Sequence, residues 1–186
     1  MDRLSADKSV LVVVDVQERL AAVVPEDARA RLIRNAEVLL ETAARLNVPV
    51  LASQQYTKGL GPTVSPLRER LEKLGVVPFE KLDFDACEAP AFARALANLA
   101  QARQAVVIGM EAHICVFQTA RELARRGYVT YVAEDAVASR TEENRLAGMS
   151  LVARAGAVPT VTEAIVFDWL RRAGTDDFKA VSRLIK

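Results

Sequence analysis

Short apolar runs rich in β-branched residues recur along the chain, and longer helical stretches separate them. The clearest run covers residues 10–14, where every position is apolar, as is typical of a parallel strand covered on both faces. Strands alternating with helices predict right-handed crossovers and a parallel sheet between two helix layers. We expect a three-layer α/β/α Rossmann-like domain whose six-stranded, mainly parallel sheet uses residues 10–14, 48–52, 76–79, 105–109, 129–133 and 157–160.

Helical patterning fills the intervals between these runs. Glycines at 127 and 156 follow two of the stretches, as expected just beyond a helix C-terminus. The predicted helices cover residues 26–46, 67–74, 89–102, 113–126, 141–155, 162–172 and 175–184. Because no Gly/Ser-rich linker interrupts the 186 residues, we expect one domain over residues 1–186.

Composition excludes several classes of function. Lys and Arg number 25 against 24 Asp and Glu, a balance that argues against binding nucleic acid or an anionic membrane. The apolar runs are far shorter than the roughly 18 residues that span a bilayer, and the N-terminal residues do not form a signal peptide. With two Cys and one His, neither a disulfide framework nor a zinc site is expected. We expect a soluble, cytoplasmic protein with reduced thiols and no metal or other cofactor.

Ligands of doubly wound sheets bind beyond the carboxyl ends of the strands, where strand order reverses. The first predicted strand is followed by Asp15, Val16 and Gln17 rather than by a Gly-x-Gly-x-x-Gly turn, so a dinucleotide site is not expected. The candidate positions are therefore residues 15–17, 53–56, 80–81, 110–115 and 134–135.

Cys115 lies in the turn that enters a predicted helix. The positive end of the helix dipole would favour its thiolate, although an inert, buried cysteine is the alternative. His113 is the single histidine, and side chains two residues apart on a helix do not face each other. A Cys–His pair is therefore not expected, and a group from another strand would have to activate the thiol.

Two charged residues could meet that thiol. Asp15 ends the first strand, which neighbours the fourth in a doubly wound sheet; alternatively, Asp15 caps a helix, since Glu18 completes a capping pattern. The ammonium of Lys81 would favour an ionised carboxylate and a thiolate if it reached the pocket; alternatively, it is a solvated surface charge. We interpret Cys87, the second thiol, as a packing residue.

Several segments together resemble the isochorismatase-like cysteine hydrolases, over nearly the whole chain. The segments that match in order are residues 13–17 (VVDVQ), 55–61 (QYTKGLG), 80–84 (EKLDF), 109–120 (GMEAHICVFQTA) and 135–140 (DAVASR). The second and fourth are similar to the isochorismatase-domain-containing branch of that family.

The resemblance implies a site. It places an Asp–Lys–Cys triad at Asp15, Lys81 and Cys115: the carboxylate takes the thiol proton, the ammonium holds both groups, and the sulfur attacks a carbonyl carbon to form a thioester. It also implies a cis peptide bond at Met110–Glu111, with the N–H groups of Glu111 and Cys115 forming an oxyanion hole. The expected pocket is lined by Gln17, Gln55, Tyr56, Phe84, His113 and Ile114. Core packing is the alternative for the aromatic residues, and capping of loop backbone is the alternative for Gln55.

Two departures from related families narrow the expected reaction. The metal-binding histidines of nicotinamidases are absent from residues 53–58, so metal-dependent nicotinamide hydrolysis is not expected. Isochorismatases cleave a vinyl ether without a nucleophilic thiol, so Cys115 favours hydrolysis of the C–N bond of a small amide. The alternatives are isochorismatase-type ether hydrolysis and a catalytically silent oligomeric binding protein. Since relatives are commonly homo-oligomers, we expect self-association and a small-molecule substrate.

Overall fold

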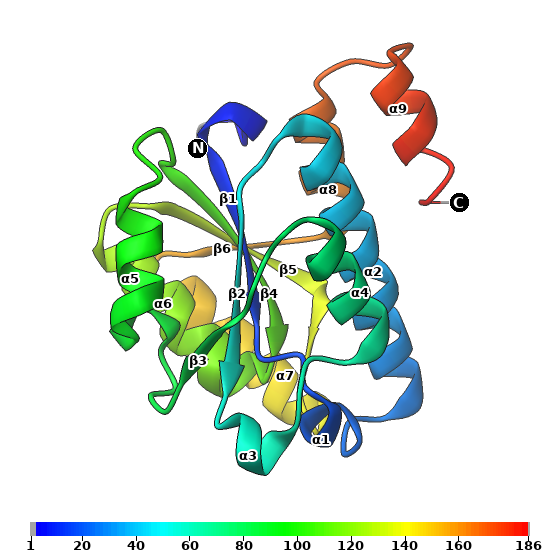
Figure 1. Ribbon diagram of the computed structural model, residues 1–186. Helices are drawn as coiled ribbons and strands as arrows, with labels where there is room; N and C mark the ends of the chain where they lie inside the picture. Colours follow the sequence, from blue (N-terminus) through cyan, green and yellow to red (C-terminus); the bar gives the residue numbers. More distant parts are fainter. Residues whose placement is uncertain (1–2, 186) are drawn as a thin grey trace.

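Six parallel strands form one twisted sheet in the computed structural model of the chain, which describes residues 3–185 (Figure 1). The strand order is β3-β2-β1-β4-β5-β6, and every pairing is parallel. The expected six-stranded α/β/α fold is therefore confirmed. The strands are β1 (Ser9–Val14), β2 (Val50–Gln55), β3 (Phe79–Lys81), β4 (Gln104–Met110), β5 (Val129–Ala138) and β6 (Val158–Thr160).

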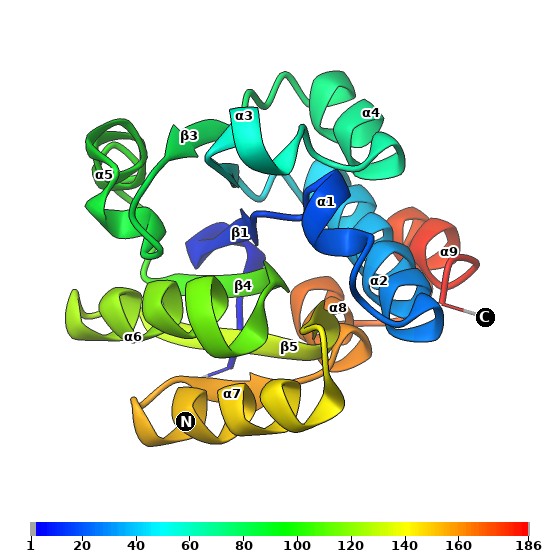
Figure 2. The ribbon, with the colours of Figure 1, turned by 90° about the horizontal axis from the view of Figure 1, so that it is seen from below.

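Helices cover both faces of this sheet (Figure 2). One layer contains α2 (Glu26–Leu46), packed with α4 (Ser65–Lys73), α8 (Thr162–Leu170) and α9 (Asp176–Val181). The other contains α5 (Pro90–Ala97), α6 (Phe117–Arg125) and α7 (Glu142–Arg154). The short helices α1 (Glu18–Ala21) and α3 (Thr57–Leu60) lie beyond the carboxyl ends of β1 and β2. None of the described helices combines the length and the apolar character that crossing a membrane requires.

The central strands are buried along their whole length, and strand order reverses between them. All residues of β1 and β4 are buried, which accounts for their continuous apolar sequences. The prediction that the first and fourth strands are neighbours is confirmed, because Val14 pairs with Gly109. Gly109 has φ +123°, and a Cβ there would lie 2.0 Å from the carbonyl oxygen of Val14. Only glycine fits this close approach of the two strands.

The structure corrects the bounds of several elements. The third strand is Phe79–Lys81 rather than residues 76–79; Val77 is 80% exposed, and Pro78 has no N–H to donate to a neighbouring strand. The helix expected over residues 113–126 begins as a π-helical turn, Ala112–Val116, and continues as α6. The helix expected over residues 89–102 ends at Ala97.

Candidate active site

The carboxylate of Asp15 lies at the centre of a buried polar cluster beyond the carboxyl ends of the strands. Asp15 directly follows β1 in a left-handed conformation, φ 48°. Its Oδ1 accepts a hydrogen bond from Ser53 Oγ (2.7 Å), and its Oδ2 accepts one from Lys81 Nζ (2.7 Å). Gln17 precedes α1, and no side chain caps that helix. The helix-cap interpretation of Asp15 is therefore wrong.

Lys81 ends β3, and its ammonium is enclosed by oxygen atoms. The side chains of Lys81 and Asp15 are both 0% exposed, so the surface-charge interpretation of Lys81 is wrong. Besides Asp15, the ammonium donates to Gln55 Oε1 (2.6 Å) and to the carbonyl oxygens of Asp83 (3.1 Å) and Phe84 (3.2 Å). Burying an ion pair costs free energy unless such additional hydrogen bonds satisfy both partners, as they do here.

Cys115 lies in the π-helical turn between β4 and α6, and its buried thiol is close enough to Asp15 and Lys81 for both charges to act on it. Burial is the largest influence and raises the pKa of Cys115 to about 12; the negative charge of Asp15 adds to the rise, and Lys81 partly offsets it. The expectation of a resting thiolate is therefore wrong, because burial and the carboxylate outweigh the ammonium. The thiol is protonated at neutral pH and has a carboxylate beside it that can accept its proton.

Hydrogen bonds within the turn and a close contact with helix α7 position the turn that carries Cys115. The Met110–Glu111 peptide bond that precedes it is cis, and the Glu111 carbonyl oxygen accepts hydrogen bonds from the N–H groups of Ile114 and Val116 (3.1 and 3.2 Å). Helix α7 approaches so closely that a Cβ on Gly148 would lie 2.6 Å from the carbonyl carbon of Ala112. The position of the thiol therefore depends on elements distant in sequence.

The Glu111 carboxylate is buried and makes an ion pair that also ties this turn to the segment after β5. Glu111 accepts hydrogen bonds from Arg140 Nη2 (2.9 Å), Nε (3.1 Å) and the Arg140 backbone N–H (3.0 Å). Burial alone would raise the pKa of Glu111, but these hydrogen bonds and the charge of Arg140 lower it below its usual value. The Glu111 carboxylate is therefore charged, and its hydrogen bonds with Arg140 connect the turn to the segment after β5.

His113 is engaged away from the thiol. Its Nδ1 lies 3.1 Å from Ser139 Oγ, and the same hydroxyl accepts a hydrogen bond from the Ala112 N–H (3.1 Å). His113 and Ile114 are both half-buried. Their expected contact with a substrate stays a prediction.

The two expected glutamines hold loops. Gln17 is fully buried; its amide donates to the carbonyl oxygens of Gln55 (2.9 Å) and Gly61 (2.7 Å) and accepts from the Gln55 N–H (2.7 Å). Gln55 donates to the Leu82 carbonyl oxygen (2.6 Å) while accepting from Lys81. These bonds make both glutamines positioning residues for Lys81 and its loop, and a direct substrate contact from either stays a prediction.

An open pocket adjoins the cluster at β3. It has a volume of about 510 Å³, and its lining residues are Tyr56, Lys58, Glu80, Lys81, Leu82, Asp83, Ala89 and Pro90. Tyr56 is 50% exposed and the nearby Phe84 is 53% exposed. The core-packing interpretation of these two aromatic residues is therefore wrong. Within residues 3–185, no group of three His, Cys, Asp or Glu side chains could hold a metal ion.

Sequence reasoning did not assign roles to Ser53, Ser139 and Arg140. Ser53 ends the apolar part of β2 and pairs with Val14 in the register of the sheet, so its position at a strand end was the available signal. Ser139 and Arg140 follow β5 within a segment that matched the family. Their hydrogen bonds to the turn around Cys115 depend on tertiary packing that no local pattern reveals.

The parallel fold and its polar cluster at the reversal of strand order define a doubly wound α/β protein with an enzyme-like site. The family model of the isochorismatase domain matches residues 9–164. The chain belongs to the isochorismatase family.

Similar proteins come from distant organisms. A secreted isochorismatase effector of Phytophthora sojae is 34% identical over 100% of this chain and 88% of its own length. Isochorismatase domain-containing protein 2 of Danio rerio is 31% identical over 98% of this chain and 89% of its own length. A solved structure from Caenorhabditis elegans, called MAR1 ribonuclease, is 32% identical with a TM-score of 0.90, covering 99% of this chain and 92% of that one.

Proposed function

We propose that this family member is a cysteine-dependent hydrolase that cleaves the C–N bond of a small amide through a thioester on Cys115. One observation carries the proposal: the buried Cys115 thiol lies within the electrostatic influence of the Asp15 carboxylate, which Lys81 holds at 2.7 Å in a fully buried ion pair. A nucleophile beside a base that a third group orients is the arrangement that covalent catalysis needs.

In the first step, Asp15 accepts the thiol proton as the sulfur attacks the carbonyl carbon of the amide. A C–S bond forms, and the carbonyl π electrons move to the oxygen. The backbone N–H groups of Glu111 and Cys115 are proposed to stabilise this oxyanion; one such donor contributes roughly 3 kcal/mol. Lys81 stays protonated and offsets the charge that the attacking sulfur acquires.

In the second step, the C–N bond breaks, and protonated Asp15 returns its proton to the leaving nitrogen. The products are a free amine, or ammonia from a primary amide, and an acyl thioester of Cys115. Water then attacks the thioester as Asp15 accepts a proton from it. The C–S bond breaks, the carboxylic acid leaves, and the proton returns to the sulfur, which restores the resting site.

A neutral substrate suits the charges around the pocket. Lys81 already pairs with Asp15. The other cation that lines the pocket, Lys58, is outnumbered by two acidic lining residues, Glu80 and Asp83. Isochorismatase-type hydrolysis of a carboxylated vinyl ether would require unpaired cations for the carboxylates, so we rank it second. A catalytically silent binding protein is the third candidate.

We also infer that the chain self-associates and acts in the cytoplasm. Tyr56, Leu82 and Phe84 expose apolar surface beside the pocket, with Leu82 72% exposed, and neighbouring exposed apolar side chains commonly mark interaction sites.

The proposed compartment is based on the two thiols. Both of them, Cys87 and Cys115, are free, as expected of a reducing compartment. Fractionation of tagged protein checks the compartment.

A panel of small amides, with detection of released ammonia, tests the proposed activity. Wild type and Cys87→Ala should release ammonia from the same amides, whereas Cys115→Ala should lose at least about 1,000-fold in kcat/KM. A vinyl ether and a short single-stranded RNA complete the panel, the RNA because of the activity named for the nematode structure. Turnover of an amide by Cys115→Ala at the wild-type rate would eliminate the thioester route.

A further inference from the structure

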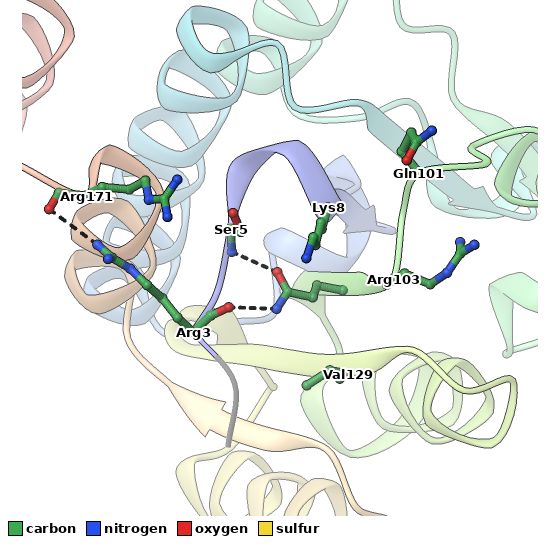
Figure 3. A pocket seen from close by; sticks show the side chains of 8 residues that line it. Arg3, Ser5, Lys8, Gln101, Arg103, Val129 and Arg171 are labelled. Atoms are coloured by element: carbon green, nitrogen blue, oxygen red, sulfur yellow. Dashed lines mark hydrogen bonds between the residues drawn. The ribbon is translucent and has the colours of Figure 1, made fainter.

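A second pocket lies at the opposite end of the sheet from Cys115. It has a volume of about 540 Å³ and lies at the amino ends of β1, β4 and β5 (Figure 3); its lining residues are Arg3, Ser5, Lys8, Gln101, Arg103, Gln104, Val129 and Arg171. The six residues of β1 separate it from the cluster around Asp15, a length of roughly 20 Å. Pockets of this volume accommodate small organic ligands.

Positive charge dominates this second pocket. Four of its lining residues are cationic (Arg3, Lys8, Arg103 and Arg171), and none of them is acidic. Among residues 3–185, two carboxylates lie close by: Asp7 accepts a hydrogen bond from Ser5 Oγ, and Asp168 lies 4.0 Å from Arg3 Nε. Even with both counted, the cations exceed the acids by two, four minus two, whereas the net charge of the whole chain is +1.

Buried and partly buried hydrogen bonds fix the segment that forms one wall of this pocket. The side-chain amide of Gln104 accepts from the Ser5 N–H (2.8 Å) and donates to the Arg3 carbonyl oxygen (2.9 Å). Ser9 Oγ donates to the Ser5 carbonyl oxygen (2.7 Å) and accepts from Trp169 Nε1 (3.0 Å). The backbone that carries Arg3 and Lys8 is therefore ordered before any ligand binds, which lowers the entropic cost of binding.

Several donors around the pocket are not used by the protein. In the described part of the chain, the Lys8 ammonium and the Arg171 guanidinium make no hydrogen bond and no ion pair within 4.0 Å, and only the longer-range charge of Asp7 acts on both. Arg103 uses Nη1 on the carbonyl oxygens of Ala100 and Ala102, and Arg3 uses Nη2 on the carbonyl oxygen of Arg171 (Figure 3). Both guanidinium groups keep further N–H groups.

We propose that this pocket binds a small phosphorylated molecule. A phosphate group carries about −1.5 to −2 charge and three strong acceptor oxygens, which match the surplus of two positive charges and the unused donors. A single carboxylate has two oxygens and one charge, too few for the cations of Arg3, Lys8 and Arg171. The site is independent of the proposed hydrolase chemistry, because it shares no residue with the cluster around Cys115.

Calorimetric titration with inorganic pyrophosphate at about 0.15 M salt tests this site, since that ionic strength screens diffuse attraction. Wild type should bind one pyrophosphate per chain. Lys8→Gln/Arg171→Gln should weaken binding about 100-fold, roughly tenfold for each charge-assisted contact removed. Lys73→Gln/Arg94→Gln is the matched control: it removes the same two charge types from exposed positions on α4 and α5 and should bind as wild type does.

Cys115→Ala should also bind pyrophosphate with unchanged affinity, so failure of the hydrolase proposal and failure of this one are distinguishable. Three results would each overturn the inference: no saturable binding by wild type, equal weakening in both double variants, or citrate binding as tightly as pyrophosphate. Absence of saturable binding would mean that there is no site. Equal weakening in both double variants would mean that binding reflects only diffuse positive charge. Equally tight binding of citrate would mean that the pocket does not prefer phosphate.

Discussion

In the proposed mechanism, the buried thiol of Cys115 attacks without being ionised at rest. Burial raises its pKa to about 12 despite the nearby ammonium of Lys81, so reactivity must come from the adjacent carboxylate rather than from a standing thiolate. Asp15 can act as that base because Ser53 and Lys81 hold one carboxylate oxygen each. Because the thiol is protonated at rest, its proton must pass to Asp15 as the sulfur attacks the substrate.

The raised pKa predicts how alkylation of Cys115 depends on pH. Because deprotonation favours attack and the thiol keeps its proton until about pH 12, the iodoacetamide reaction of the Cys87→Ala variant should accelerate steadily from pH 7 to pH 10 without a plateau. Mass spectrometry of the labelled peptide measures the rate. A plateau that begins near pH 7 would show a resting thiolate and contradict this account.

The two thiols should also differ in rate. Burial raises the pKa of Cys87 even further, Asp85 adds to the rise, and Arg126 offsets only part of it; within residues 3–185, no cation makes an ion pair with Asp85 as Lys81 does with Asp15. At pH 8, wild type should therefore be labelled at Cys115 at least about tenfold faster than at Cys87. Equal, slow labelling of both would favour the silent binding protein.

Removing the ammonium should damage both stability and activity. Lys81→Met leaves the Asp15 carboxylate buried without its counter-ion, which should lower the free energy of unfolding by about 3–5 kcal/mol. Arg70→Met breaks the partly exposed ion pair with Glu41 (3.0 Å) and should cost less than about 1 kcal/mol. Urea denaturation measures both.

A double variant separates stability from catalysis. Asp15→Asn/Lys81→Met removes both charges, so it should regain part of the stability that Lys81→Met loses while amide hydrolysis stays undetectable. Recovery of activity together with stability would show that the ion pair is only structural.

The elements that the sequence predicted best are those whose neighbours bury them most. β1 and β4 have continuous apolar sequences because helices cover both faces, and the positions after them identified Asp15 and Cys115. β3 was misplaced because Val76 and Val77 resemble a strand although Val77 is exposed. The π-helical turn and the hydrogen bond from Ser53 to Asp15 depend on contacts between segments distant in sequence, which periodicity does not encode.

Helix α7 provides a test of how the turn around Cys115 is positioned. Gly148→Ala would place a Cβ 2.6 Å from the Ala112 carbonyl carbon and 2.7 Å from the His113 nitrogen. The helix or the turn must shift, which should cost about 1–3 kcal/mol and lower kcat by at least about tenfold. Ser150→Ala, at an exposed position of α7, is the control and should change neither; wild-type activity in Gly148→Ala would mean that the turn tolerates displacement.

The whole molecule carries a candidate site at each end of its sheet. The carboxyl ends of the strands carry the buried cluster and an apolar rim, formed by the exposed side chains of Tyr56, Leu82 and Phe84, while the amino ends carry the basic pocket. A sheet with strand order β3-β2-β1-β4-β5-β6 separates them, and the two sites share no residue. A ligand at one end can therefore be tested without altering the chemistry at the other.

The apolar rim should mediate self-association. Leu82 is 72% exposed beside the pocket, so Leu82→Ser should shift sedimentation velocity profiles toward the monomer. Leu146→Ser changes a leucine that is 53% exposed on α7 and should leave the profile unchanged. A monomeric wild type, or equal shifts in both variants, would remove the rim from the interface.

Intact-mass spectrometry during turnover of a slowly hydrolysed amide tests the central proposal most directly. Wild type and Cys87→Ala should gain the mass of one acyl group, which hydroxylamine removes as expected of a thioester, and Cys115→Ala should gain none. Product formation by Cys115→Ala at an undiminished rate, or an acyl group mapped to another residue, would contradict the account.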